Sequence, residues 1–239
     1  MNGTEKEADD QRVTLDGALK MAVESLQEGQ IDRAEYILSE ILKAFPDNAS
    51  AAEFMGITRY RQGKEDEALA LLKRATTLAP DAPGVFMNYG NVLVETAHFD
   101  DAIDAYTRLL QLAPESAAGW NNMGVLLRSK RRFDLAEEAL RKALELNPDD
   151  AAAHHNLGNL LLAAGRIEES VKCGLRALTL LDDPNVGRKL LGLAYGMLGE
   201  TEKAIEVYKD WLAEEPGNAT AEHHLAALQG KTPERASDA

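Results

Sequence analysis

The sequence predicts an all-α protein, a right-handed α-solenoid (superhelix) of six helix-turn-helix repeats followed by a C-terminal capping helix. Three observations predict it. Prolines recur every 34 residues, columns of small and large apolar residues keep the same spacing, and each repeat holds two short amphipathic stretches separated by a turn. We number the repeat so that the proline takes position 32, which places the first repeat at 15–48.

The proline column sets the period and ends the second helix of each repeat, because proline cannot continue the helical hydrogen-bond pattern. In repeat five Asp182 takes this position, with Pro184 two residues later. That repeat also has Ser170 and Gly174 where others have Ala and a large apolar residue, so its second helix is expected to pack least well. The prolines at position 32 are Pro46, Pro80, Pro114, Pro148 and Pro216.

A glycine column at position 8 predicts a close approach of two helices in each repeat. Glycine inside a helix costs roughly 0.5–1 kcal/mol relative to alanine, so its recurrence needs a packing reason. Alanine at position 20 of most repeats would supply the facing surface. The glycines are Gly56, Gly90, Gly124, Gly158 and Gly192.

The periodicity divides the chain without insertions. The six repeats are expected at 15–48, 49–82, 83–116, 117–150, 151–184 and 185–218. Residues 219–230 are expected to form the capping helix, 1–14 a disordered acidic N-terminal segment and 231–239 a flexible tail. The N-terminal segment has no apolar run typical of a signal peptide, and no apolar run is long enough to insert into a membrane.

The amino-acid composition argues against several classes of ligand and of chemistry. A formal net charge of −14 argues against nucleic acid, which is bound through basic patches. The single cysteine, Cys173, permits no internal disulfide and no cysteine-based metal site, which fits a cytoplasmic location. Adjacent histidines such as His154 and His155 cannot chelate one metal as an i, i+4 pair does. We therefore expect no cofactor, no metal site, no catalytic residue and no enzyme activity.

The proline, glycine, alanine and Leu/Tyr columns resemble the tetratricopeptide repeat (TPR) signature over 15–218. The resemblance implies protein or peptide binding on a concave wall made by first-helix positions 2, 5, 6, 9, 12 and 13. Chaperone-binding TPR domains grip a C-terminal carboxylate with Lys, Asn and Arg at positions 5 and 9 of three successive repeats. No such triplet is present here.

Asparagines mark the predicted wall. Asn88, Asn122 and Asn156 stand at position 6 of three successive repeats, an arrangement similar to the asparagine ladder of O-linked N-acetylglucosamine transferases. A side-chain amide can donate and accept, so such a row can pair with an extended peptide backbone. The alternative is that the amides bridge neighbouring helices of the fold. The predicted peptide-binding groove comprises Phe54, Asn88, Asn91, Asn121, Asn122, Arg128, His155, Asn156 and Asn159.

Apolar residues at wall positions, such as Leu190 and Leu193, either pack against adjacent helices or form an anchor or self-association face. The leading hypothesis is a protein–protein interaction scaffold that binds an extended segment. The C-terminal stretch from Glu222 resembles the junction of bacterial TPR-methyltransferase proteins, so a substrate-recognition part of a larger methyltransferase or glycosyltransferase is one alternative. A self-assembling homo-oligomer is another.

Overall fold

The computed structural model describes residues 14–180 and 185–230. Within these ranges it contains thirteen α-helices and no strand, which confirms the all-α, helical-repeat fold class. The expectations for 1–13, for Asp182 and Pro184 and for 231–239 fall outside the described residues. First helices of the hairpins are 13 residues long and second helices 14.

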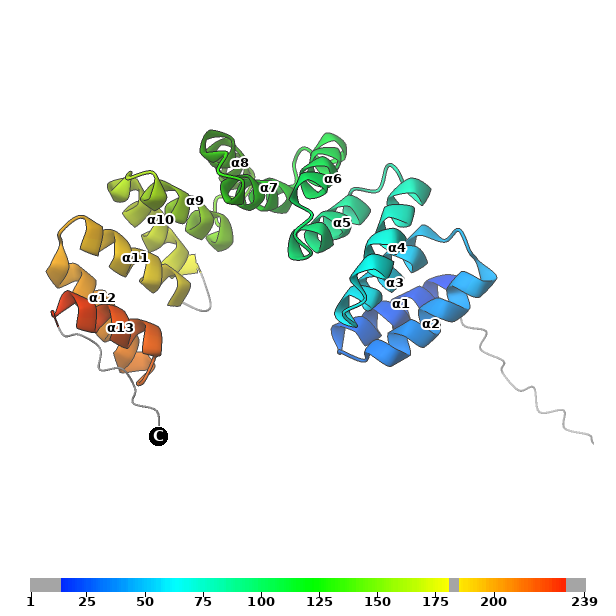
Figure 1. The fold of residues 1–239 in the computed structure, drawn as a ribbon, viewed down its shortest axis with the longest axis horizontal. Helices are drawn as coiled ribbons and strands as arrows, with labels where there is room; N and C mark the ends of the chain where they lie inside the picture. Colours follow the sequence, from blue (N-terminus) through cyan, green and yellow to red (C-terminus); the bar gives the residue numbers. More distant parts are fainter. Residues whose placement is uncertain (1–13, 181–184, 231–239) are drawn as a thin grey trace, which may run out of the picture. The chain divides into compact units, whose positions relative to one another are not determined.

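The chain divides into two compact units, with the boundary in the sequence between Leu112 and Ala113. In each unit the two helices of a hairpin lie side by side, as Figure 1 shows. Unit 1 contains α1 (Leu15–Gln27), α2 (Ile31–Ala44), α3 (Ala49–Arg61), α4 (Glu65–Leu78), α5 (Pro83–Glu95) and α6 (Phe99–Leu112). Unit 2 contains α7 (Ala117–Ser129), α8 (Phe133–Leu146), α9 (Ala151–Ala163), α10 (Ile167–Leu180), α11 (Asn185–Met197), α12 (Thr201–Glu214) and α13 (Ala219–Leu228).

Side-chain caps begin most of the first helices. The residue at position 34, directly before the next repeat, accepts a hydrogen bond from a backbone N–H of the first turn, which satisfies a group left free at the helix end. Ala82 has no such side chain, and there Pro83 opens α5 with a φ suited to the first helical position. The capping residues are Thr14, Asn48, Ser116, Asp150 and Asn218.

The turn inside each hairpin needs a residue with positive φ at position 15. Glycine tolerates that conformation, whereas a residue with a Cβ is strained in it. Two repeats nevertheless place other residues there, Ala97 with φ of 61° and Arg131 with φ of 59°. The remaining repeats use Gly29, Gly63, Gly165 and Gly199.

The glycine at position 8 makes room for the side chain at position 24 of the same hairpin. A Cβ added to Gly56 would lie 2.7 Å from Cγ of Leu72, and one added to Gly124 would lie 2.6 Å from Cγ of Leu140. Both distances are shorter than real Cβ contacts, so each pair of helices can approach this closely only without a side chain at position 8. Leu72 and Leu140 are completely buried as a result.

Repeat five solves the same problem differently. Its position 24 is Gly174, so no side chain of α10 covers Gly158 in the usual way. Leu190 from α11 fills the space instead, 2.5 Å from a Cβ built on Gly158, and Leu191 lies 3.0 Å from one built on Gly174. Ser170 is fully buried and donates to the Gly158 carbonyl at 2.8 Å. The loose packing expected for α10 is therefore not found at these positions.

The structure decides between the two alternatives for Leu190 on the predicted wall. It stands at position 6, but it is only 1% exposed because it packs over Gly158. It is consequently a core residue and not an anchor site for a partner, as the packing alternative supposed.

Substituting two helical glycines separates packing from helix propensity. Gly124→Ala should lower the free energy of unfolding by about 1–3 kcal/mol, since the new methyl group overpacks Leu140. Gly84→Ala is the matched control, because a Cβ at Gly84 meets no atom within 4 Å. It should raise stability by up to about 1 kcal/mol through helix propensity. If both substitutions changed the free energy of unfolding in urea equally, the close approach of the helices at Gly124 would be contradicted.

The positive-φ turns give a second prediction. Ala97→Gly should raise the free energy of unfolding by about 0.5–1 kcal/mol, because relief of left-handed strain outweighs the added entropy of the unfolded chain. Ala164→Gly is the control, since Ala164 is also an exposed alanine at a hairpin turn but has φ of −82°. The control should lose stability in the same unfolding assay, and a loss in both variants would argue against strain at Ala97.

Candidate functional site

In unit 1 the predicted wall asparagines are held by bonds to other side chains. Asn88 of α5 donates from Nδ2 to Oε1 of Glu53 on α3 at 2.6 Å. Glu53 is 8% exposed, and this burial raises the pKa of its carboxyl group. Asn91 accepts at Oδ1 from the Tyr106 hydroxyl at 2.8 Å.

Phe54, the apolar member of the predicted groove, is half-buried on α3. It packs against a core cluster that includes Leu38, Ile41 and Met55. The structure therefore places its ring between the core of unit 1 and solvent.

Unit 2 repeats the relation seen between Asn88 and Glu53. Asn156 of α9 donates from Nδ2 to Oδ1 of Asn121 on α7 at 2.9 Å. In both units the position-6 amide reaches the position-5 side chain of the preceding repeat, 35 residues earlier. Asn121 in turn lies 3.5 Å from Oδ1 of Asn122. Bridging between neighbouring first helices, the alternative weighed from sequence, is thus present at both places.

These bridges engage only the nitrogen of each amide. The Oδ1 atoms of Asn88 and Asn156 receive no hydrogen bond from any residue that the structure describes. Both side chains are half-buried, and neither oxygen is among the fully enclosed unpaired polar atoms. Each oxygen consequently remains available as an acceptor on an amide whose orientation the fold has already set.

His155 extends the polar stretch of unit 2. Its Nε2 lies 2.7 Å from Nδ2 of Asn159, so an amide N–H donates to it and the ring proton belongs on Nδ1. That Nδ1 is enclosed and has no partner within the described part of the chain. Burial lowers the pKa of His155, and the positive charges of Arg128 and Lys189 lower it further. The ring is therefore neutral at physiological pH.

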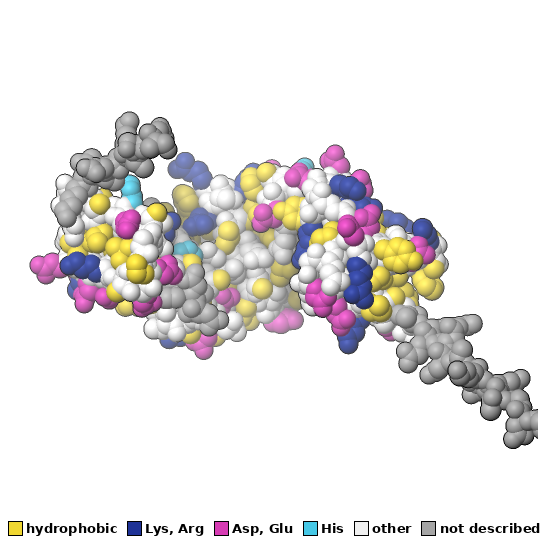
Figure 2. Space-filling model, turned by 90° about the horizontal axis from the view of Figure 1, so that it is seen from below, with side chains coloured by type: hydrophobic (Ala, Val, Ile, Leu, Met, Phe, Trp, Pro, Cys, Tyr) yellow, Lys and Arg dark blue, Asp and Glu magenta, His cyan; other side chains and the backbone are white. Residues whose placement is uncertain are grey.

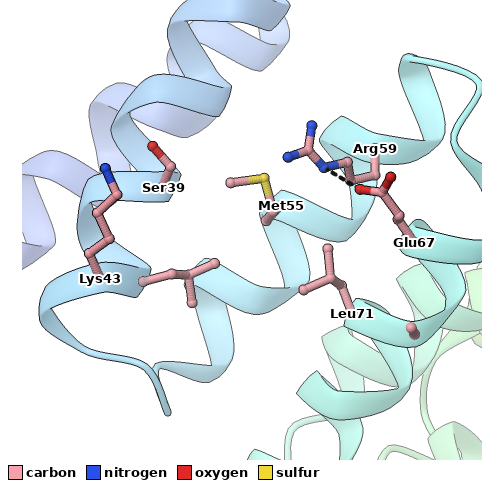
Figure 3. A pocket seen from close by; sticks show the side chains of 8 residues that line it. Ser39, Lys43, Met55, Arg59, Glu67 and Leu71 are labelled. Carbon is pink, nitrogen blue, oxygen red and sulfur yellow. Dashed lines mark ion pairs between the residues drawn. The ribbon is translucent and has the colours of Figure 1, made fainter.

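A pocket of about 540 Å³ lies in unit 1 between α2, α3 and α4 (Figure 3). Met55 and Leu71 form its apolar part. Arg59 is paired with Glu67 at 3.0 Å and with Glu35 at 2.6 Å, and Lys43 is paired with Glu40. The charged groups thus satisfy one another, and the pocket offers no nucleophile with an adjacent base.

The described residues offer few other groups for metal binding or catalysis. Across 14–180 and 185–230, no three His, Cys, Asp or Glu residues come together as metal ligands, and no helix is both long and apolar enough to cross a bilayer. Cys173 is half-buried, and burial raises the pKa of its thiol, which disfavours the reactive thiolate. On the face drawn in Figure 2, acidic and basic side chains are interspersed.

Sequence reasoning located the asparagine columns but missed the partner of Asn88. Glu53 stands at position 5, one of the predicted wall positions, but it is a buried acceptor for the next repeat. One sequence signal could have found this pair. A position-6 amide lies 35 residues after a position-5 acceptor, both in Asn88 with Glu53 and in Asn156 with Asn121.

Glu53 gives a pH-dependent prediction. Its carboxyl pKa is higher in the folded chain than in the unfolded one, so folding favours the protonated form and the charged form costs stability as pH rises above about 4.5. Glu53→Gln keeps an acceptor for Asn88 and removes the charge. The variant should be more stable than the wild type at pH 7, with the difference shrinking toward pH 4. Urea unfolding at both pH values measures this, and a pH-independent difference would contradict it.

Solved structures share this fold at low sequence identity. PilW, described as a widely conserved type IV pilus biogenesis factor, aligns with a TM-score of 0.79 at 19% identity, covering 87% of this chain and 96% of that one. Pseudomonas aeruginosa PilF gives 0.78 at 18% identity, covering 89% and 96%. YrrB, described as a TPR protein with an unusual peptide-binding site, gives 0.62 at 21% identity, covering 78% and 96%.

No curated protein sequence matches the chain. The resemblances to glycosyltransferases and methyltransferases and the cytoplasmic location stay predictions. The TPR resemblance is confirmed by the solved structures and by a family model. That model describes the C-terminal domain of cilia and flagella-associated protein 70 and matches residues 6–238. The chain therefore belongs to this family of tetratricopeptide-repeat domains.

Proposed function

We propose that the chain is a protein-interaction module that binds an extended segment of another polypeptide along the first helices of its repeats. The observation that carries the proposal is the state of Asn88 and Asn156. Each amide is held through its nitrogen by the preceding repeat, while its oxygen remains free to accept a bond from a residue outside the described chain.

An extended segment suits this arrangement chemically. Its backbone presents N–H donors at regular intervals whatever its side chains, and each donor can meet a side-chain amide oxygen. Because the Asn88 and Asn156 amides are already oriented, binding loses less side-chain entropy than it would with freely rotating groups. The bridges within the fold and peptide binding are therefore compatible, since they use different atoms of the same amide.

The fold supports a binding role on general grounds. TPR arrays expose long surfaces made by successive helices, and such surfaces are used for protein recognition. The described residues offer paired charges, a neutral His155 and a thiol with a raised pKa, and these groups do not form a catalytic constellation. We accordingly propose recognition as the role of this chain.

Peptide selection followed by substitution tests the proposal. Peptides selected from a random displayed library on the wild-type chain should bind the Asn88→Ala/Asn156→Ala variant at least about 3-fold more weakly, since each lost bond is worth roughly 3- to 10-fold. Asn147→Ala is the matched control, because Asn147 is an exposed asparagine at the C-terminal end of the second helix α8. It should leave affinity unchanged.

Circular dichroism must show equal helicity for the wild type and both variants, because Asn88→Ala also removes the partner of Glu53. Fluorescence anisotropy with labelled peptides then gives the affinities. Unaltered affinity in the double variant would remove the amides from the binding surface and leave only their bridging role.

A further inference from the structure

The first helices of unit 2 differ in charge from the rest of the chain. The chain carries a formal net charge of −14, yet α7, α9 and α11 contain no aspartate or glutamate. Their charged residues are Arg128 on α7 and Arg188 and Lys189 on α11. The acidic residues in the described part of unit 2 lie instead on the second helices, in turns and on α13. The surface formed by these three first helices is therefore cationic within an acidic protein.

Two of the three cations are not neutralised within the fold. Arg188 is 9% exposed and is paired with Glu214 of α12. Arg128 and Lys189, by contrast, have neither a hydrogen bond nor an ion pair with any residue that the structure describes. Lys189 is exposed and Arg128 is half-buried, so neither side chain is enclosed. Both charges consequently remain available to a ligand.

Contacts between the first helices bring these two cations to one surface. Asn156 of α9 bonds to Asn121 of α7, and Leu190 of α11 packs over Gly158 of α9, so α9 lies between α7 and α11. The three helices therefore present their wall positions side by side.

His155 of α9 shows that both cations lie near its ring. Burial lowers its pKa most, and the positive charges of Arg128 and of Lys189 lower it further. Interactions of exposed charges fade beyond a Debye length of about 10 Å at 0.1 M salt, so both cations act on this ring from nearby. We call Arg128, His155 and Lys189 the cationic stretch.

We propose that the cationic stretch binds acidic side chains of the bound polypeptide, with their carboxylates at Arg128 and Lys189. The planar guanidinium of Arg128 can donate two parallel hydrogen bonds to one carboxylate, and the Lys189 ammonium attracts a second as a compact charge. Because α7, α9 and α11 carry no acid that could compete, a carboxylate from outside meets no like charge on these helices.

The position of Asn156 connects the cationic stretch with the proposed mode of binding. Asn156 follows His155 directly on α9 and has an unpaired amide oxygen. A backbone N–H of the segment can bond to that oxygen while acidic side chains of the same segment reach Arg128 and Lys189. The net charge of the whole chain favours basic partners over long range, so this preference for acids is a local one.

This inference rests on the proposed function and names a side-chain class of the bound segment. The probes are peptides selected on the wild-type chain from a random displayed library, each also made with its Asp and Glu replaced by Asn and Gln. The measured quantity is the affinity for the acidic peptide divided by the affinity for its amide version, obtained by fluorescence anisotropy with the full chain.

The ratio should exceed 1 for the wild type and should fall about 3- to 10-fold in Arg128→Gln/Lys189→Gln, since each exposed charge pair is worth up to about 5-fold in affinity. It should also fall as salt is raised, because salt screens exposed charges. Lys172→Gln is the matched control, because it removes an equal charge from an exposed lysine on the second helix α10. This control should leave the ratio unchanged.

Asn156→Ala separates the two proposals, because it should weaken both versions of a peptide alike and leave the ratio unchanged. Selected peptides without Asp or Glu, or an equal ratio in the wild type and Arg128→Gln/Lys189→Gln, would overturn the inference alone if Asn156→Ala still weakened binding. Failure to select any peptide would overturn the proposed function together with this inference. Equal binding of a scrambled acidic peptide would mean nonspecific attraction, and would also overturn the inference.

NMR spectra locate the bound carboxylates independently of affinity. The imidazole signals of His155 should shift when an acidic peptide is added to the wild type, and should shift less when its amide version is added at equal occupancy. Signals of His155 that respond equally to both peptides would place the carboxylates elsewhere and contradict the assignment to Arg128 and Lys189.

Discussion

The contact between the glycine at position 8 and the side chain at position 24 determines how closely the two helices of a hairpin can lie. It is seen as Gly56 with Leu72 and as Gly124 with Leu140, where even one added carbon would collide. A helix pair this close excludes water and buries the position-24 side chain completely, which provides apolar stabilisation that a 30-residue hairpin could not otherwise reach. Each repeat loses some helix propensity to the glycine in exchange for this packing.

The same contact also brings polar atoms to defined places. A tyrosine at position 24 extends past the glycine, so that its hydroxyl emerges beside the next residue of the first helix. The Tyr106 hydroxyl donates there to Asn91, whereas the Tyr208 hydroxyl has no partner among the described residues. Along the first helices, the bridges from Asn88 to Glu53 and from Asn156 to Asn121 orient amides in the same way.

Much of the fold could be predicted because each signal was local or repeated. Proline at position 32 and glycine at positions 8 and 15 act through backbone geometry, which the sequence displays directly. Ala97 and Arg131 show the limit, since tertiary packing forces a positive φ on residues whose own preference opposes it. The site was harder to predict. A column of asparagines can be read from sequence, but the acceptor of Asn88 and the missing acceptor of Tyr208 depend on contacts between helices. For Leu190 the sequence left packing and an anchor site open, and only the contact with Gly158, which Gly174 leaves uncovered by α10, decides for packing.

The substitution of Leu190 for a missing side chain has a consequence for how the chain can be divided. For Gly56, Gly90, Gly124 and Gly192 the side chain over the glycine comes from the same hairpin, although the apolar core also joins neighbouring repeats. In repeat five the side chain over Gly158 is Leu190 of repeat six. A truncation after α10 would therefore leave a cavity above Gly158. Any shortened or recombined version of this array should therefore keep repeats five and six together.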